Sequence, residues 1–405
     1  MPRLLFNLSL WTGIGIGALA PIVWSLYWPA GGGLDVVGYY LGRDFFNVWS
    51  APQVVDRHGV LMLFDLQGYR WAQADLVGHH TFFHNWGYPL HVLLAAVPFS
   101  MLPYFPSLIV WTLLGLALYL AAVLPQVAPE QRRIAVVFLL LSPAALANTL
   151  GGQNGFYTAA LFLSAVALLD RRPWHAGVLL GLLTIKPHLG VLIAPMLVVA
   201  MAWRTIAAAC ATAALLVGAS LVVYGSEPWI LWLTETSAYQ YRVLAEFKGF
   251  HSYMMTSVFA SVRAFGQSPE LAQMVQGVVS LGVIATSAVV FRKTTDVGLR
   301  ALLLTSGTLL ASPYVFNYDM TAITAAILWV VLARPSLPGP YLAALGAAWV
   351  MPGTVWVLHN MHMGLAPLGY GGAFAVAVAL ILREQGAVER ARAAQPGLAG
   401  ITGLP

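Results

Sequence analysis

Ser107–Leu124 reads SLIVWTLLGLALYLAAVL, and none of these side chains is charged. A helix needs about 20 mainly apolar residues to span the hydrocarbon core of a bilayer, so a run of this kind predicts a transmembrane helix. Similar runs recur along the chain. Thirteen apolar stretches are candidates for membrane helices, from Leu8–Trp28 at the beginning to Ala366–Leu382 near the end.

The composition supports a membrane protein. The chain has 405 residues, of which 59% are hydrophobic and 9% are charged, and its mean hydropathy is +0.77. Soluble proteins average about 25% charged residues, so most of this surface must face lipid. The basic residues are scattered through short loops, which indicates membrane topology rather than binding of nucleic acid. The single cysteine, Cys210, lies in an apolar run, and no disulfide framework can form.

We therefore predict an all-α polytopic membrane protein with about 10–13 transmembrane helices. Residues 1–385 form one transmembrane domain in this prediction, and the first apolar run is too long for a signal peptide, so we expect it to be retained. Two stretches, about 35–86 and 225–270, are rich in aromatic and polar residues. We expect them to be structured outer loops, the first containing short interfacial helices. Residues 386–405 are expected to form a solvated C-terminal tail.

Arginine and lysine residues mark alternate loops from Ile134 onward. Placing these loops in the cytoplasm satisfies the positive-inside rule and puts the polar residues at the other helix ends on the outer side. The region from Trp86 to Arg133 is less regular, because two full crossings there would place Arg132 outside. Either one of its two apolar runs is not a simple crossing, or the chain contains another break.

Asp44 follows the first apolar run and is flanked by aromatic residues. A carboxylate at this place could act as a general base that deprotonates an acceptor hydroxyl at the membrane surface. The alternative is a solvated loop aspartate or an ion-pair partner of Arg43.

Lys186 is the one lysine inside an apolar run, and Pro187 and His188 follow it. A lysine in hydrocarbon costs on the order of 3 kcal/mol, so it usually has a partner or a function. At a helix break near the outer face it could bind a phosphate. The alternative is that its side chain snorkels to the interface.

Two further clusters carry polar side chains between apolar runs. Gln153 and Asn154 follow a Gly-Gly pair and could bind sugar hydroxyls, although a simple turn with Asn near a helix start would look the same. In Pro313–Asp319 we single out Tyr314 and Asp319 as substrate contacts, and the alternative for Asp319 is a helix N-cap.

No metal or cofactor is expected. The spacing of His79, His80 and His84 is not diagnostic of a metal site. The chain also contains no Gly-rich dinucleotide fingerprint after a strand, which disfavours a cytosolic nucleotide-sugar donor.

Four motifs together resemble the GT-C superfamily of polyprenyl-phosphate-sugar-dependent glycosyltransferases, and glycosyltransferase family 87 with its mycobacterial α-1,2-mannosyltransferases in particular. The motifs are Arg43-Asp44-Phe45, Tyr88-Pro89-Leu90, Gly152-Gln153-Asn154 leading to Ile185-Lys186-Pro187, and Ser312-Pro313 to Tyr318-Asp319. Tyr314 is a departure, because many relatives have a histidine there.

The resemblance implies a GT-C-like bundle in the bacterial plasma membrane with its active site on the periplasmic side. It implies an inverting transfer, most simply of mannose, from a polyprenyl-phosphate donor to a glycolipid or glycan acceptor. Asp44 would be the catalytic base, and Lys186 would contact the donor phosphate. Arg43, Gln153, Asn154, His188, Tyr314 and Asp319 complete the expected substrate site.

The alternative function is a secondary transporter or lipid flippase. Such proteins usually have internal repeats and ionisable residues near the bilayer midplane. This chain shows no repeat, and its polar clusters gather on one predicted side, although Lys186-Pro187 is the kind of helix break that a transporter uses. A scaffold or assembly role has no positive support.

Overall fold

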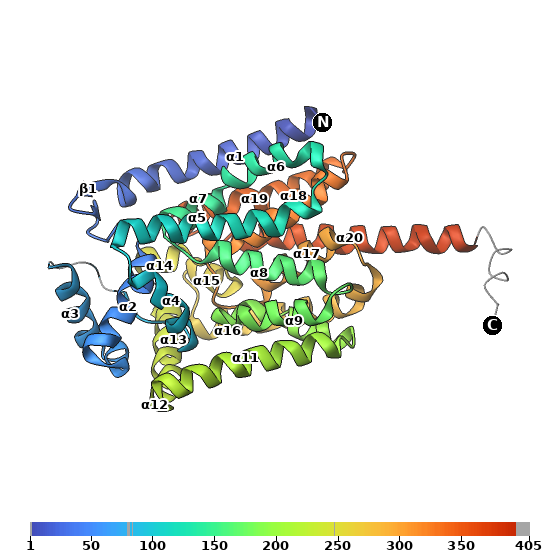
Figure 1. Ribbon diagram of the computed structural model, residues 1–405. Coiled ribbons are helices and arrows are strands. Elements are labelled where there is room, and N and C mark those ends of the chain that lie inside the picture. The colour runs from blue at the N-terminus through green and yellow to red at the C-terminus, as the bar shows by residue number, and fades with distance from the viewer. Residues whose placement is uncertain (1, 79–81, 83, 247, 394–405) are drawn as a thin grey trace.

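The computed structural model describes residues 2–78, 82, 84–246 and 248–393. In this part of the chain nearly all regular structure is helical, which confirms the all-α prediction (Figure 1). A short antiparallel pair of strands, β1 (Pro29–Gly31) and β2 (Leu34–Asp35), follows the first helix.

Six helices in the described residues are long and apolar enough to cross a membrane. A bent pair, α6 (Arg132–Leu140) and α7 (Pro143–Leu150), would make a seventh crossing, with a 50° bend between its halves. The six are α1 (Pro2–Ile22, continued by a π-helical turn, Val23–Tyr27), α5 (Tyr104–Val123), α11 (Trp203–Tyr224), α16 (Pro269–Val290), α19 (Gly339–Asn360) and α20 (Ala366–Ala393).

Shorter apolar helices lie among the long ones. Nearly every residue of α17 and α18 is buried, so protein rather than lipid surrounds them. A helix covered by its neighbours need not match the bilayer thickness. With the bent pair counted, the predicted 10–13 crossings are reached only when at least three of these short helices are counted as crossings. The short apolar helices are α4 (His91–Ser100), α8 (Gly155–Leu168), α9 (Pro173–Leu182), α10 (Ile193–Val199), α17 (Val297–Ala311) and α18 (Thr321–Ala333).

The structure resolves the path of the chain after Trp86. Helix α4 has 10 residues, which at 1.5 Å per residue is about half of what a crossing needs. The indole nitrogen of Trp49 donates to the carbonyl of Leu102, which follows α4, at 2.9 Å. The hydroxyl of Tyr104, at the start of α5, donates to the carbonyl of Leu41 at 2.6 Å. The junction of α4 and α5 therefore lies beside residues 41–49, and of these two helices only α5 is long enough to cross a membrane.

Ion pairs join several helix ends at the opposite end of the bundle, where the N-terminus of α1 also lies (Figure 1). Arg300 of α17 is 2.7 Å from Asp170, which follows α8. Arg334, after α18, is 3.0 Å from both Asp296 and Glu384 of α20. The pairs hold the ends of four helices together at this end.

Both predicted outer loops are built of short helices. The first contains α2 (Asp44–His58), a 3₁₀ turn (Val60–Phe64) and α3 (Leu66–Val77). The second contains α12 (Glu227–Leu231), a π-helical turn (Trp232–Thr236), α13 (Ser237–Glu246), α14 (Gly249–Tyr253) and α15 (Val258–Ala264). Helix α20 continues to Ala393, into the segment predicted as a tail, and residues 394–405 lie outside the described residues.

Candidate functional site

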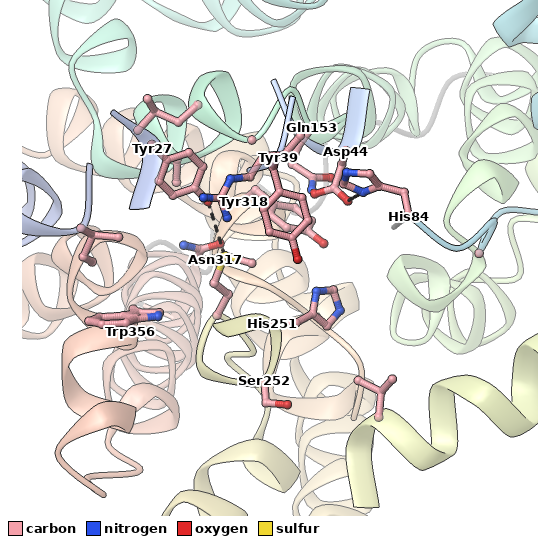
Figure 2. Close-up of a pocket in the computed structure, with 18 of the residues that line it drawn as sticks. Tyr27, Tyr39, Asp44, His84, Gln153, His251, Ser252, Asn317, Tyr318 and Trp356 are labelled. Atoms are coloured by element: carbon pink, nitrogen blue, oxygen red, sulfur yellow. Dashed lines mark hydrogen bonds and ion pairs between the residues drawn. The ribbon is translucent and has the colours of Figure 1, made fainter. Parts of the chain in front are cut away.

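A cavity of about 440 Å³ opens at the end of the bundle where α1 ends (Figure 2). Segments far apart in the sequence meet here, so the fold rather than any local motif creates the site. Its walls come from the end of α1, residues 39–44, residues 84–87, residues 147–153, α13, α14, residues 314–318 and Trp356 of α19.

Asp44 is the first residue of α2, and its half-exposed carboxylate faces the cavity. Its backbone nitrogen donates to the carbonyl of Gly151 at 3.1 Å. Gly152 has a φ of +56°, and a Cβ there would clash with the carbonyl of Gly42. Glycine is therefore required for this close approach. The approach lets the Gln153 amide nitrogen donate to Asp44 Oδ2.

His84 lies on the other side of the Asp44 carboxylate, with its Nδ1 3.7 Å from Asp44 Oδ1 (Figure 2). Partial burial of the carboxyl by itself raises its pKa, but the hydrogen bond and charge of His84, together with weaker contributions from other cations, hold the pKa of Asp44 below its ordinary value. The charges of His251 and Arg43 act in the same direction. Asp44 is therefore an ionised carboxylate at neutral pH, oriented by Gln153 and able to accept a proton from a molecule in the cavity.

Arg43 also lines the cavity, but its guanidinium is already engaged. It forms a buried ion pair with Asp35 at 2.8 Å, donates to the carbonyl of Leu26, and lies 3.8 Å from the centroid of the Tyr27 ring. Asp35 in turn accepts from three backbone amides of residues 37–39. This network fixes the turn before α2. The ion-pair partner of Arg43 is Asp35, so the alternative that Asp44 pairs with Arg43 is wrong.

Lys186 lies behind the cavity wall. Its Nζ is 2.6 Å from Asp319 Oδ1, and the exposed side-chain fractions are 8% and 0%. The ammonium also lies 4.6 Å from the centroid of the Tyr318 ring, and Tyr318 lines the cavity. Lys186 therefore pairs with Asp319 inside the protein instead of snorkelling to the interface. Asp319 Oδ2 accepts from the backbone nitrogen of Phe316 at 3.0 Å. Phe316 is therefore the N-cap residue of the 3₁₀ turn Asn317–Met320, and Asp319 caps it from the third position of the turn rather than as the predicted N-cap.

The remaining predicted residues divide between the two places. Tyr314 lines the cavity, and the His188 ring packs edge-on against it at 6.0 Å. Asn154 is the residue before α8, its side chain makes no capping hydrogen bond, and its buried Oδ1 has no hydrogen-bond partner among the described residues. The cavity thus brings together Arg43, Asp44, Gln153 and Tyr314, whereas Asn154, Lys186, His188 and Asp319 lie behind its surface.

Sequence reasoning missed several cavity residues. It considered His84 only as a metal ligand, and His79 and His80 lie outside the described residues. Among the described residues no group of three His, Cys, Asp or Glu side chains could hold a metal ion. The sequence signal that could have found His84 was its position just before Tyr88-Pro89-Leu90, one of the four motifs that carry the resemblance. The cavity residues not predicted include Tyr27, Tyr39, His251, Asn317 and Lys248.

Comparison with known proteins gives one match. A family model described as glycosyltransferase family 87 matches residues 86–313. The matched region contains Gln153 and Lys186, whereas Asp44 and His84 precede it. No curated protein and no solved structure matches the chain.

Proposed function

The chain belongs to glycosyltransferase family 87, and from this premise we propose that it transfers a sugar from a polyprenyl-phosphate donor, with Asp44 as the general base. Mannose is the proposed sugar, and a glycolipid or glycan is the proposed acceptor. The proposed place of reaction is the periplasmic face of a bacterial plasma membrane, because the cavity lies at the end of the bundle away from the ion pairs of Arg300 and Arg334.

The observation that carries the proposal is the ionised carboxylate of Asp44, held between Gln153 and His84 at a cavity large enough for a sugar. An acceptor hydroxyl bound to Asp44 would give its proton to the carboxylate while its oxygen attacks the anomeric carbon. The bond between that carbon and the phosphate oxygen breaks on the opposite side, and its electron pair leaves with the phosphate. The transfer therefore inverts the anomeric centre.

The walls of the cavity suit an amphiphilic donor. The wall formed by α1 is apolar at Leu19, Ile22 and Val23, so an isoprenoid chain could pack there while its phosphate and sugar lie among polar residues. Lys186 as a contact for the donor phosphate stays a prediction, and its buried ion pair with Asp319 favours a role in positioning the cavity wall.

The test is sugar transfer by the purified protein in detergent or liposomes. Radiolabelled polyprenyl-phosphate mannose should give a labelled acceptor, whereas GDP-mannose should give none. Transfer from GDP-mannose alone would contradict the proposed donor. The rival function, a transporter or flippase, predicts movement of the lipid across the liposome membrane with no labelled product.

A further inference from the structure

The cationic groups near the cavity differ in whether a carboxylate already neutralises them. Arg43 is paired with Asp35 at 2.8 Å, and Lys186 is paired with Asp319 at 2.6 Å. Each pair is nearly fully buried, so a phosphate that recruited either cation would leave a carboxylate buried without its partner. Removing one partner of a buried ion pair is strongly unfavourable. Neither cation is therefore a good binding group for an incoming phosphate.

Lys248 has a different environment. It lies between α13 and α14, lines the cavity and is exposed. None of the ion pairs among the described residues includes Lys248, although Glu246 lines the same cavity. Its ammonium is therefore available to a ligand. Three residues further along, the ring of His251 packs 4.7 Å from the ring of Phe316, which fixes its place on the wall.

The direction of the proposed reaction indicates where a phosphate must lie. In an inverting displacement the attacking and leaving oxygens lie on opposite sides of the anomeric carbon, so the leaving phosphate must face the base across the sugar. Figure 2 shows His251 across the cavity from the Asp44–His84 pair. We propose that Lys248 and His251 form the binding site for the phosphate of the lipid-linked donor. The inference rests on the proposed function, because it assigns the leaving group of that reaction.

The buried pair of Lys186 and Asp319 acquires a positioning role in this arrangement. Asp319 holds the backbone of Phe316 by a 3.0 Å hydrogen bond, and the Phe316 ring stacks on Tyr318 at 5.3 Å and contacts His251. The ion pair therefore stabilises the turn that carries the aromatic support of the phosphate site. In this proposal the pair acts on the site through that turn, and Lys248 takes the place that the resemblance gave to Lys186 at the donor phosphate.

The test compares lysine variants in donor binding and in turnover. The probe is polyprenyl phosphate without a sugar, titrated against the purified protein in detergent. Lys248→Gln should weaken its binding by about 10-fold to 100-fold, because one charge-assisted contact is lost. Its donor KM should rise by a similar factor, while the acceptor KM should stay unchanged. Lys248→Arg should restore most of the affinity. Lys293→Gln, an exposed lysine in the loop before α17, is the matched control and should bind like the wild type.

A second variant separates Lys248 from Lys186. In the double variant Lys186→Met with Asp319→Asn, the amide can still accept from Phe316 and no charge is left unpaired, so we expect near wild-type affinity for polyprenyl phosphate. Equal affinity of Lys248→Gln and the wild type would overturn the inference. So would a loss of affinity in the folded double variant with none in Lys248→Gln. A wild-type protein that does not bind polyprenyl phosphate would overturn the proposed function itself.

Discussion

The amide nitrogen of Gln153 donates a hydrogen bond to the carboxylate of Asp44, across a sequence separation of 109 residues. The contact joins the first outer segment to the turn between α7 and α8. It leaves the second carboxylate oxygen of Asp44 next to His84. An amide donor stabilises the ionised form of a carboxylate and fixes its direction.

Replacing Gln153 should therefore slow transfer without abolishing it. In Gln153→Ala the carboxylate of Asp44 remains but loses its orientation, so we expect kcat to fall by roughly 10-fold to 100-fold. The measurement is the initial rate at saturating donor. Gln67→Ala, an exposed residue of α3, is the control and should behave like the wild type. A Gln153→Ala enzyme of full activity would show that the contact has no part in catalysis.

The pH dependence of kcat/KM should report the environment of Asp44. Because the pKa of Asp44 is held below its ordinary value, the acid limb of the profile should lie at lower pH than the titration of an ordinary aspartate. In His84→Asn the largest of the effects that lower the pKa of Asp44 is gone, so this pKa rises and the acid limb moves to higher pH. Profiles of the two enzymes that coincide at their acid limbs would contradict this assignment of the shift.

Breaking the Lys186–Asp319 pair should lower the free energy of unfolding. Lys186→Met leaves a buried carboxylate unpaired, which costs about 3–5 kcal/mol. Adding Asp319→Asn should recover a large part of this loss. The thermal unfolding midpoint in detergent measures both variants. Arg57→Ala removes an exposed pair with Asp75 at 3.9 Å and should shift the midpoint little. Equal unfolding midpoints of the single and the double variant would show that the unpaired carboxylate of Asp319 is not the cause of the lost stability.

Gly152 should resist substitution. A Cβ at this position meets the carbonyl of Gly42, and the φ of +56° is unfavourable for alanine. Gly152→Ala should therefore separate the 151–154 turn from Asp44 and lower both stability and kcat. Gly277→Ala, on α16 with nothing within 4 Å of its Cβ, is the matched control. Comparable activity of the two variants would show that the close approach is not needed.

The sequence predicted the helical membrane class and several cavity residues, because hydrophobic runs and isolated polar residues are local signals. Asp44 and Gln153 each stand out between apolar segments. It could not show that Lys186 is neutralised by Asp319, since the two lie 133 residues apart and pairing depends on how the helices pack. For the same reason it did not assign His84 to Asp44. The sequence left open whether α4 crosses the membrane, because a short apolar run has the same composition whether lipid or protein surrounds it.

The most direct test of the account is the transfer rate of Asp44→Asn, which removes the basic carboxylate while keeping its size and its ability to accept from Gln153. Asp56→Asn, an exposed residue of the same helix, is the control. We expect transfer from polyprenyl-phosphate mannose to fall by at least about 100-fold in Asp44→Asn, with unchanged binding of polyprenyl phosphate, and Asp56→Asn to match the wild type. Transfer by folded Asp44→Asn at the wild-type rate would show that Asp44 is not the base.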